Sequence, residues 1–249
     1  MLTGEQIKEA KALGFLRDKR SLDKFNARVL TRNGRITAKE HKIIAEASEN
    51  FGDGFVMMTT RLSLELGGIP FENINPLREY LHKFGLETGG TGAKVRPVVS
   101  CKGTNCPFGL IDTFDLSQAI HERFFVGLKD LALPHKFKIA VGGCPNNCVK
   151  PNLNDVGIVG QRIPNPNFDK NDKTSKRFFN GYAVYIGGRW GRSYNIGQKV
   201  NIDFTEKEAV LNFIEKIIMF YKDNGKTKER FSDTIKRLGF EEVEKALLA

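Results

Sequence analysis

The sequence has 249 residues, enough for one large domain or two smaller ones with sizeable cores. Hydrophobic residues make up 40% and charged residues 27%, a composition typical of globular rather than disordered or fibrous proteins. No apolar run approaches the length of a membrane span, and the N-terminus has no apolar stretch of the kind found in secretory signals. We therefore expect a cytoplasmic protein with no membrane partner, in which thiols stay reduced.

The net charge of +10 predicts an anionic partner. Small anions and acidic proteins both meet this requirement, and so does a plain solvated basic surface. Zinc-finger spacing, RNP-type aromatic motifs and arginine tracts do not occur, so nucleic acid is not the favoured partner.

The first 90 residues alternate between strand and helix patterns. Residues 25–34 predict a strand that ends at an Asn-Gly turn. Thr37 and Glu40 stand at capping-box spacing before a helix that stops at Gly52. A strand pattern over 54–66 and a helix over 74–85 follow, and this order predicts an α+β unit of the ferredoxin-like kind.

A glycine-rich stretch, residues 87–96, predicts a boundary or a loop over a ligand. Beyond it, strands are expected near 96–100, 136–141, 156–160 and 181–187, and helices near 113–128 and 205–222. Thr205 and Glu208 have capping-box spacing for the second helix. The polar, proline-broken residues 162–177 predict a surface loop.

The four cysteines fall into two pairs, in "SCKGTNC" (100–106) and "GGCPNNC" (142–148). A helical turn at 144–148, with Pro145 in its first turn, would direct both sulfurs of the second pair to one side and point free N–H groups at an anion. Gly142 and Gly143 allow the backbone to approach a large ligand.

Spacing alone leaves three interpretations of these cysteines open. Structural zinc usually has two residues between paired cysteines, whereas four and three occur here. Buried thiols need no such pairing. An iron–sulfur cluster accepts varied spacing because it is wider than a single ion.

The cysteine motifs and several others together resemble the sirohaem and [4Fe-4S] sulfite and nitrite reductase family. The resemblance is carried, in the family's order, by "VMMTTRLSLELGGIP" (56–70), "KVRPVVSC" (94–101), "SCKGTNC", "LPHKFKIAVGGC" (133–144), "GGCPNNC" with "DVGIVG" (155–160), and "YAVYIGGRWG" (182–191). It implies a ferredoxin-like half-domain over 1–90. It also implies a sirohaem- and [4Fe-4S]-binding α/β domain with C-terminal helices over 91–249.

The resemblance also implies roles for individual residues. The cluster ligands would be Cys101, Cys106, Cys144 and Cys148, and the last would also bind the sirohaem iron. The cationic substrate pocket would consist of Arg61, Arg96, Lys136 and Lys138. Gly142, Gly143, Asn146 and Asn147 would lie against the cofactors. Without the family, surface salt bridging would be the preferred interpretation of the basic residues.

The implied activity is the six-electron reduction of sulfite to sulfide. Lys138 favours sulfite, because nitrite reductases of the family tend to have asparagine there. The alternatives are a nitrite reductase, which forms ammonia, and a non-catalytic sirohaem subunit for electron transfer.

The chain departs from the family pattern in three respects. Four residues rather than five separate the first two cysteines, and His135 stands where arginine is common. The chain holds one repeat, whereas full-size assimilatory enzymes hold two. We therefore hypothesise that a homodimer or a paired subunit supplies the missing surface, and that an external donor such as ferredoxin supplies electrons.

Overall fold

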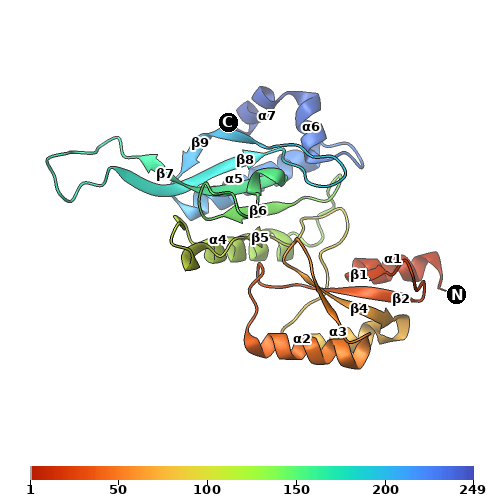
Figure 1. Ribbon diagram of the computed structural model, residues 1–249. Helices are drawn as coiled ribbons and strands as arrows, with labels where there is room; N and C mark the ends of the chain where they lie inside the picture. The colour runs from red at the N-terminus through yellow and green to blue at the C-terminus, as the bar shows by residue number, and fades with distance from the viewer. Residues whose placement is uncertain (1) are drawn as a thin grey trace. The chain divides into compact units, whose positions relative to one another are not determined.

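The computed structural model describes residues 2–249. The chain divides into two compact units, Met1–Gly92 and Ala93–Ala249, and each has a hydrophobic core of its own. Helices and strands are mixed in both units, so the predicted α+β class is confirmed (Figure 1). No described helix is both long and apolar enough to cross a bilayer.

The first unit is a four-stranded antiparallel sheet with helices. Its elements are α1 (Gly4–Ala12), β1 (Phe15–Arg17), β2 (Lys24–Val29), α2 (Ala38–Phe51), β3 (Val56–Met58), β4 (Leu64–Pro70) and α3 (Ile74–His82), and the strand order is β1-β2-β4-β3. Alternate residues of β2 are buried, and they pack with the apolar faces of α2 and α3. The predicted strand, the two helices and the Thr37 capping box are confirmed.

The second unit is built on a five-stranded mixed sheet of order β5-β6-β7-β8-β9. The strands are β5 (Val99–Ser100), β6 (Ile139–Gly142), β7 (Val156–Pro164), β8 (Phe178–Ile186) and β9 (Gln198–Phe204). The first three are parallel, and β8 and β9 add antiparallel to them. The helices are α4 (Thr113–Ile120), α5 (Lys207–Asn224), α6 (Phe231–Leu238) and α7 (Phe240–Leu248).

The core of this unit lies between the sheet and its helices. One stripe of α5, from Val210 to Tyr221, is buried. The rings of Phe137, Tyr221 and Phe231 form an aromatic cluster with centroids 5.2–5.6 Å apart. Phe137 belongs to the segment that leads into β6, so this cluster fixes the position of a segment that carries predicted site residues.

Four local predictions differ from the structure. Residues 54–66 are not one strand, because a turn at 59–63 separates β3 from β4. The helix expected over 113–128 continues after α4 as a π-helical turn, His121–Val126. The Thr205 capping box is wrong: α5 begins after Glu206, and no side chain caps it. A helical turn at 144–148 is also wrong, as described below.

Candidate functional site

The two cysteine segments meet at one edge of the second sheet. β5 pairs parallel to β6, with Ser100 opposite Val141, so the carboxyl ends of both strands lie side by side. Cys101 follows β5 directly, and its N–H donates to the Val141 carbonyl at 3.1 Å. Cys144 follows β6 by two residues. The fold therefore brings together cysteines that lie 43 positions apart in the sequence.

The sulfur of Cys101 is held in a cradle of backbone donors. The N–H groups of Gly143 and Gly103 point at Cys101 Sγ from 3.1 and 3.4 Å. A Cβ on Gly143 would lie 3.3 Å from the same sulfur. N–H donors stabilise the anionic form of sulfur, which is the form that binds metals.

Cys106 is positioned by a short, tightly packed loop. A 3₁₀ turn, Gly103–Asn105, lies between the first two cysteines, and the N–H of Cys106 donates to the Gly103 carbonyl at 2.9 Å. Gly103 has φ +45°, and a Cβ there would lie 2.1 Å from the Thr113 hydroxyl. The Thr113 hydroxyl in turn donates to the Cys101 carbonyl at 2.7 Å. The loop with four intervening residues is thus anchored to the start of α4.

The segment between Cys144 and Cys148 forms turns rather than a helix. Asn147 has φ +56° and Lys150 φ +49°, values that interrupt a right-handed helix. The Asn147 N–H donates to the Cys144 carbonyl at 3.4 Å, and the Lys150 N–H donates to the Asn147 carbonyl at 2.9 Å. Donors toward this site therefore come from the two glycines at Cys101 rather than from a helix N-terminus at Pro145.

Asn147 is the side chain here that most directly points to an external ligand. Its Nδ2 donates to Asn152 Oδ1 at 3.0 Å, which fixes the orientation of the amide. Its Oδ1 is buried and has no hydrogen-bond partner within the described chain. A buried acceptor without a donor is costly, so this position fits a ligand that brings one. Asn146, by contrast, is exposed.

None of the four cysteines is buried. Cys101, Cys106 and Cys144 are half-buried, Cys148 is exposed, and none forms a disulfide. In the described residues, no three His, Cys, Asp or Glu side chains stand close enough to hold one metal ion. The ligands of a four-iron cluster are spaced more widely than those of a single ion, so the open arrangement is compatible with a cluster.

Three of the four predicted cations lie on the segments that lead into β5 and β6. Arg96, Lys136 and Lys138 are half-buried, and Phe137 and Ile139, which alternate with the lysines, are buried. The two lysines therefore share a face, as their spacing predicts. The Arg96 N–H donates to the Phe137 carbonyl at 2.8 Å, which joins the two segments.

The electrostatic field in this region is strongly positive. Burial lowers the pKa of Lys136, and the charges of Arg230 and Arg96 lower it further. Burial together with Arg230 and Lys136 likewise lowers the pKa of His135, whose Nδ1 accepts the Lys136 N–H at 2.7 Å. This histidine is neutral at neutral pH, and it positions the backbone of Lys136. Such a concentration of positive charge favours an anion.

A buried ion pair, which the sequence does not predict, lies behind Arg96, Lys136 and Lys138, called the cation cluster here. Both oxygens of Asp155 accept from Arg230 Nη2, at 3.0 and 2.9 Å, and both side chains are almost fully buried. Asp155 Oδ2 also accepts the N–H of Lys138 at 2.8 Å. In the sequence, the one signal for this ion pair is the position of Asp155 just before a buried strand. Arg230 lies 75 residues further on, so its contact with Asp155 depends on the fold.

Arg61 belongs to the first unit, in the turn between β3 and β4. It is half-buried, and its N–H donates to the Thr59 hydroxyl at 3.3 Å. The next residue, Leu62, has φ +60°, an uncommon value for a bulky side chain. Its place beside the other three cations stays a prediction.

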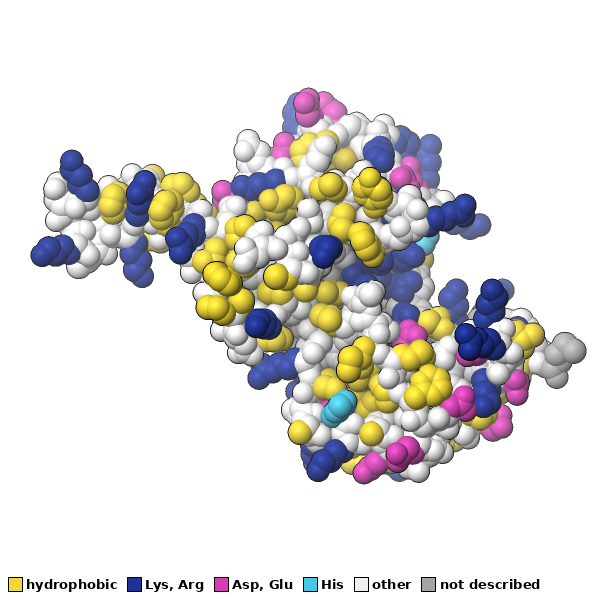
Figure 2. All heavy atoms as spheres, viewed as in Figure 1, with side chains coloured by type: hydrophobic (Ala, Val, Ile, Leu, Met, Phe, Trp, Pro, Cys, Tyr) yellow, Lys and Arg dark blue, Asp and Glu magenta, His cyan; other side chains and the backbone are white. Residues whose placement is uncertain are grey.

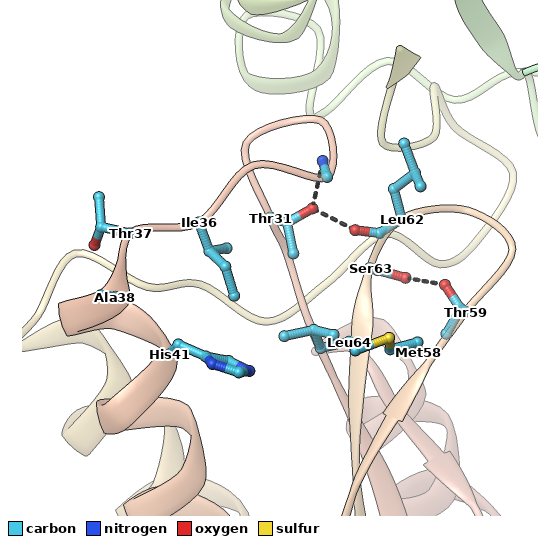
Figure 3. A pocket seen from close by; sticks show the side chains of 11 residues that line it. Thr31, Ile36, Thr37, Ala38, His41, Met58, Thr59, Leu62, Ser63 and Leu64 are labelled. Atoms are coloured by element: carbon cyan, nitrogen blue, oxygen red, sulfur yellow. Dashed lines mark hydrogen bonds between the residues drawn. The ribbon is translucent and has the colours of Figure 1, made fainter. Parts of the chain in front are cut away.

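The same turn borders a cavity of about 370 Å³ that the sequence did not predict. In Figure 3 the Thr31 hydroxyl accepts a hydrogen bond from the Gly34 N–H and donates one to the Leu62 carbonyl. The hydroxyls of Thr59 and Ser63 are hydrogen-bonded to each other. Ile36, Leu64 and Met58 provide apolar lining, and His41 lies at the end of α2 nearest the cavity (Figure 3). The size is within the range of small-molecule sites.

Comparison with known proteins identifies the family. Residues 91–248 match the family described as nitrite and sulphite reductase 4Fe-4S domain, and residues 17–84 match the nitrite/sulfite reductase ferredoxin-like half domain. The chain belongs to this family of oxidoreductases, so the predicted resemblance and the ferredoxin-like fold are confirmed. The cofactors of the family are a [4Fe-4S] cluster and sirohaem, as the resemblance implied.

Individual relatives are sulfite and nitrite reductases by name. The coenzyme F420-dependent sulfite reductase of Methanocaldococcus jannaschii is 30% identical over 81% of this chain, and the match covers 38% of that protein. The assimilatory-type sulfite reductase of Nitratidesulfovibrio vulgaris is 30% identical, with 78% of each chain covered. The fold resembles that of dissimilatory sulfite reductase I, with a TM-score of 0.77 over 90% of this chain and 69% of the other, at 19% identity.

The residues present fit the family's cofactors. Cys101 has N–H donors at its sulfur, none of the four cysteines is buried, and the buried Asn147 Oδ1 lacks a donor among the described residues. The cations occupy the opposite ends of the same two strands, which suits a long cofactor that carries carboxylates.

Proposed function

We propose that this chain is a sulfite reductase that uses sirohaem coupled to a [4Fe-4S] cluster. The observation that carries the proposal is the arrangement of β5 and β6. Accessible cysteines follow both strands, and half-buried cations precede both. A thiolate site and an anion site on one rigid pair of strands are what the reduction of a small anion at a metal cofactor requires.

The proposed ligands of the cluster are Cys101, Cys106, Cys144 and Cys148, with Cys148 shared with the sirohaem. Gly142 and Gly143 hold the strand end close to Cys101, and Asn146 and Asn147 line the cofactor. The cofactors supply electrons and the position at which the substrate is reduced.

Arg96, Lys136 and Lys138, joined by Arg61, are proposed to bind the anion and to supply protons. Lys136 suits proton donation best, because its lowered pKa makes the ammonium a stronger acid than an ordinary lysine. Lys138 is positioned through its N–H bond to buried Asp155. Arginine keeps its charge throughout and holds the anion.

Sulfite is favoured over nitrite because position 138 is a lysine, whereas the family resemblance implies asparagine there in nitrite reductases. Relatives of the chain include proteins named nitrite reductase, so both anions are tested. The test uses holoenzyme with reduced methyl viologen and measures sulfide formed from sulfite and ammonia formed from nitrite. We expect Lys138→Asn to lower the sulfite-to-nitrite ratio of kcat/KM by about tenfold or more, the value of one charge-assisted hydrogen bond. Lys129→Asn, at an exposed lysine, is the matched control.

An unchanged ratio in Lys138→Asn would overturn the role of Lys138 in specificity. Holoprotein that reduces neither anion would overturn the enzyme proposal and favour an electron-transfer subunit.

A further inference from the structure

The hairpin between β7 and β8 extends well beyond the sheet. β7 pairs with β6 only through Val159, but it pairs with β8 over its full length, ending at Pro164 opposite Phe178. On the other side, β9 pairs with β8 only from Tyr182 onward. Residues 161–180, called the arm below, therefore project from the sheet (Figure 1). The arm is a short two-stranded ribbon, 161–164 with 178–180, that carries a loop over 165–177.

The surface of the arm combines basic and hydrophobic side chains (Figure 2). The side chains of Phe168, Phe178 and Phe179 are 39–42% exposed. The arm carries five cations, namely Arg162, Lys170, Lys173, Lys176 and Arg177, against two carboxylates. In the part of the chain that the structure describes, none of these five forms an ion pair.

The two carboxylates of the arm are used to shape its tip. Asp169 accepts the Asn171 N–H at 2.8 Å, and Asp172 accepts both the N–H and the hydroxyl of Thr174, at 2.8 and 2.7 Å. The three aromatic rings stay partly exposed, and the Arg177 guanidinium lies 5.4 Å from the centre of the Phe178 ring. Among the described residues, no cation of the arm has a carboxylate partner. This combination is suited to an acidic protein partner, because aromatic residues and arginine are enriched at protein interfaces and the positive charge of the lysines attracts acidic surfaces.

The base of the arm touches the cysteine site. A Cβ on Gly160, the residue before the arm, would lie 2.4 Å from the Gly143 carbonyl oxygen. Gly143 donates to Cys101 Sγ and precedes Cys144. On the same edge Phe108, two residues after Cys106, is 64% exposed. A protein docked on the arm and Phe108 would cover the exposed cysteine loops.

We propose that the arm and Phe108 form the docking surface for a small acidic electron carrier that reduces the cluster. The inference rests on the proposed function. At each encounter the reduced carrier loses one electron and the cluster gains it, and six such transfers match one sulfite. A second copy of the chain is the weaker occupant, because both copies carry a net charge of +10. Nucleic acid would explain the charge of the arm but not its contact with the cysteine edge.

The test compares two triple variants with the same change in charge. Lys170→Glu/Lys173→Glu/Lys176→Glu alters the arm, and Lys216→Glu/Lys222→Glu/Lys236→Glu alters exposed lysines on α5 and α6. Sulfite reduction by holoenzyme is measured with a reduced acidic [4Fe-4S] ferredoxin and, separately, with reduced methyl viologen. We expect the arm variant to raise KM for ferredoxin about tenfold or more and to flatten its salt dependence, with viologen activity unchanged.

Equal effects of the two variants on KM would overturn the proposal, because general charge rather than the arm would then be responsible. Binding of oxidised ferredoxin to the holoenzyme is measured by calorimetry as well. That measurement needs no turnover, so a failure of the docking proposal stays distinct from a failure of the reductase proposal.

Two further outcomes count against the proposal. One is that the arm variant loses binding to a labelled DNA or RNA oligonucleotide but keeps binding to ferredoxin. The other is that it changes from dimer to monomer in light scattering with no change in KM for ferredoxin. Phe108→Ala is expected to raise KM for ferredoxin without altering iron content, which would locate the contact on the cysteine edge.

Discussion

At Lys136, partial burial and the guanidinium groups of Arg230, Arg96 and Arg189 act in the same direction. Each disfavours the charged ammonium, so the pKa of Lys136 lies below the usual value for lysine. A proton held less tightly is transferred more readily to a reduced substrate. The charge that attracts an anion and the acidity that helps reduce it thus come from one cluster of residues.

The pH dependence of sulfite reduction tests this role of Lys136. The protonated form is the active one, so activity is lost as pH rises through the lowered pKa of Lys136. In Lys136→Arg, whose side chain stays charged, we expect the alkaline fall of kcat to move to higher pH and kcat at neutral pH to drop by about a hundredfold for want of the donor. A pH profile of kcat identical to that of the wild type would contradict the assignment. Lys129→Arg, the same substitution at an exposed lysine outside the site, is the control.

At Gly142 and Gly143 the sequence predicts only that a ligand can approach the backbone closely. The structure adds a reason within the chain: a Cβ on Gly142 would lie 3.1 Å from Pro151, and one on Gly143 would lie 3.3 Å from Cys101 Sγ. Cys101 is remote from Gly143 in the sequence, and turns separate Pro151 from Gly142. Spacing alone therefore does not predict these contacts.

At the scale of elements, the same sequence pattern gave opposite results in two helices. Thr37 and Glu40 form a complete capping box at the start of α2, with bonds of 3.1 and 2.6 Å. Thr205 and Glu208 have the same spacing, but β9 continues to Phe204 and α5 begins only at Lys207. Thr205 is therefore not at the cap position, and the strand before it, which depends on pairing with β8, decides this.

This pair of threonines supplies a matched stability test. We expect Thr37→Ala to lower the free energy of unfolding by about 1 kcal/mol, the usual value of an N-cap side chain, and Thr205→Ala to leave it unchanged within about 0.3 kcal/mol. Urea denaturation followed by circular dichroism measures both. Equal losses in the two variants would show that the bonds at Thr37 contribute nothing specific.

At 144–148 the local signals predict a helical turn as readily as the turns that the structure has. Proline is favoured both in the first turn of a helix and at the second residue of a β-turn, so Pro145 fits either structure. The positive φ values of Asn147 and Lys150 decide between them, and asparagine is among the residues that tolerate such values. The arm was missed for a related reason: residues 162–177 are polar and proline-broken, while its register, with Ile163 opposite Phe179, depends on pairing across the hairpin.

At the scale of the whole molecule, the predicted site residues are divided between two units. Arg61 lies in the first unit, and all other predicted site residues lie in the second. The second unit alone holds the four cysteines, three cations and the arm, and it matches the family's 4Fe-4S domain. The resemblance carried by the cysteine and other motifs implies the cofactors, whereas the Asp155–Arg230 pair that holds the Lys138 backbone depends on a contact between distant segments.

We propose above all that this chain holds a sirohaem and one [4Fe-4S] cluster at the cysteine edge of β5 and β6. The direct measurement is the visible spectrum of protein purified without oxygen, with iron and acid-labile sulfide determined on the same sample. The claim predicts haem-type absorption bands with about five irons and four sulfides per chain. A colourless protein that contains one zinc ion and no labile sulfide would contradict it.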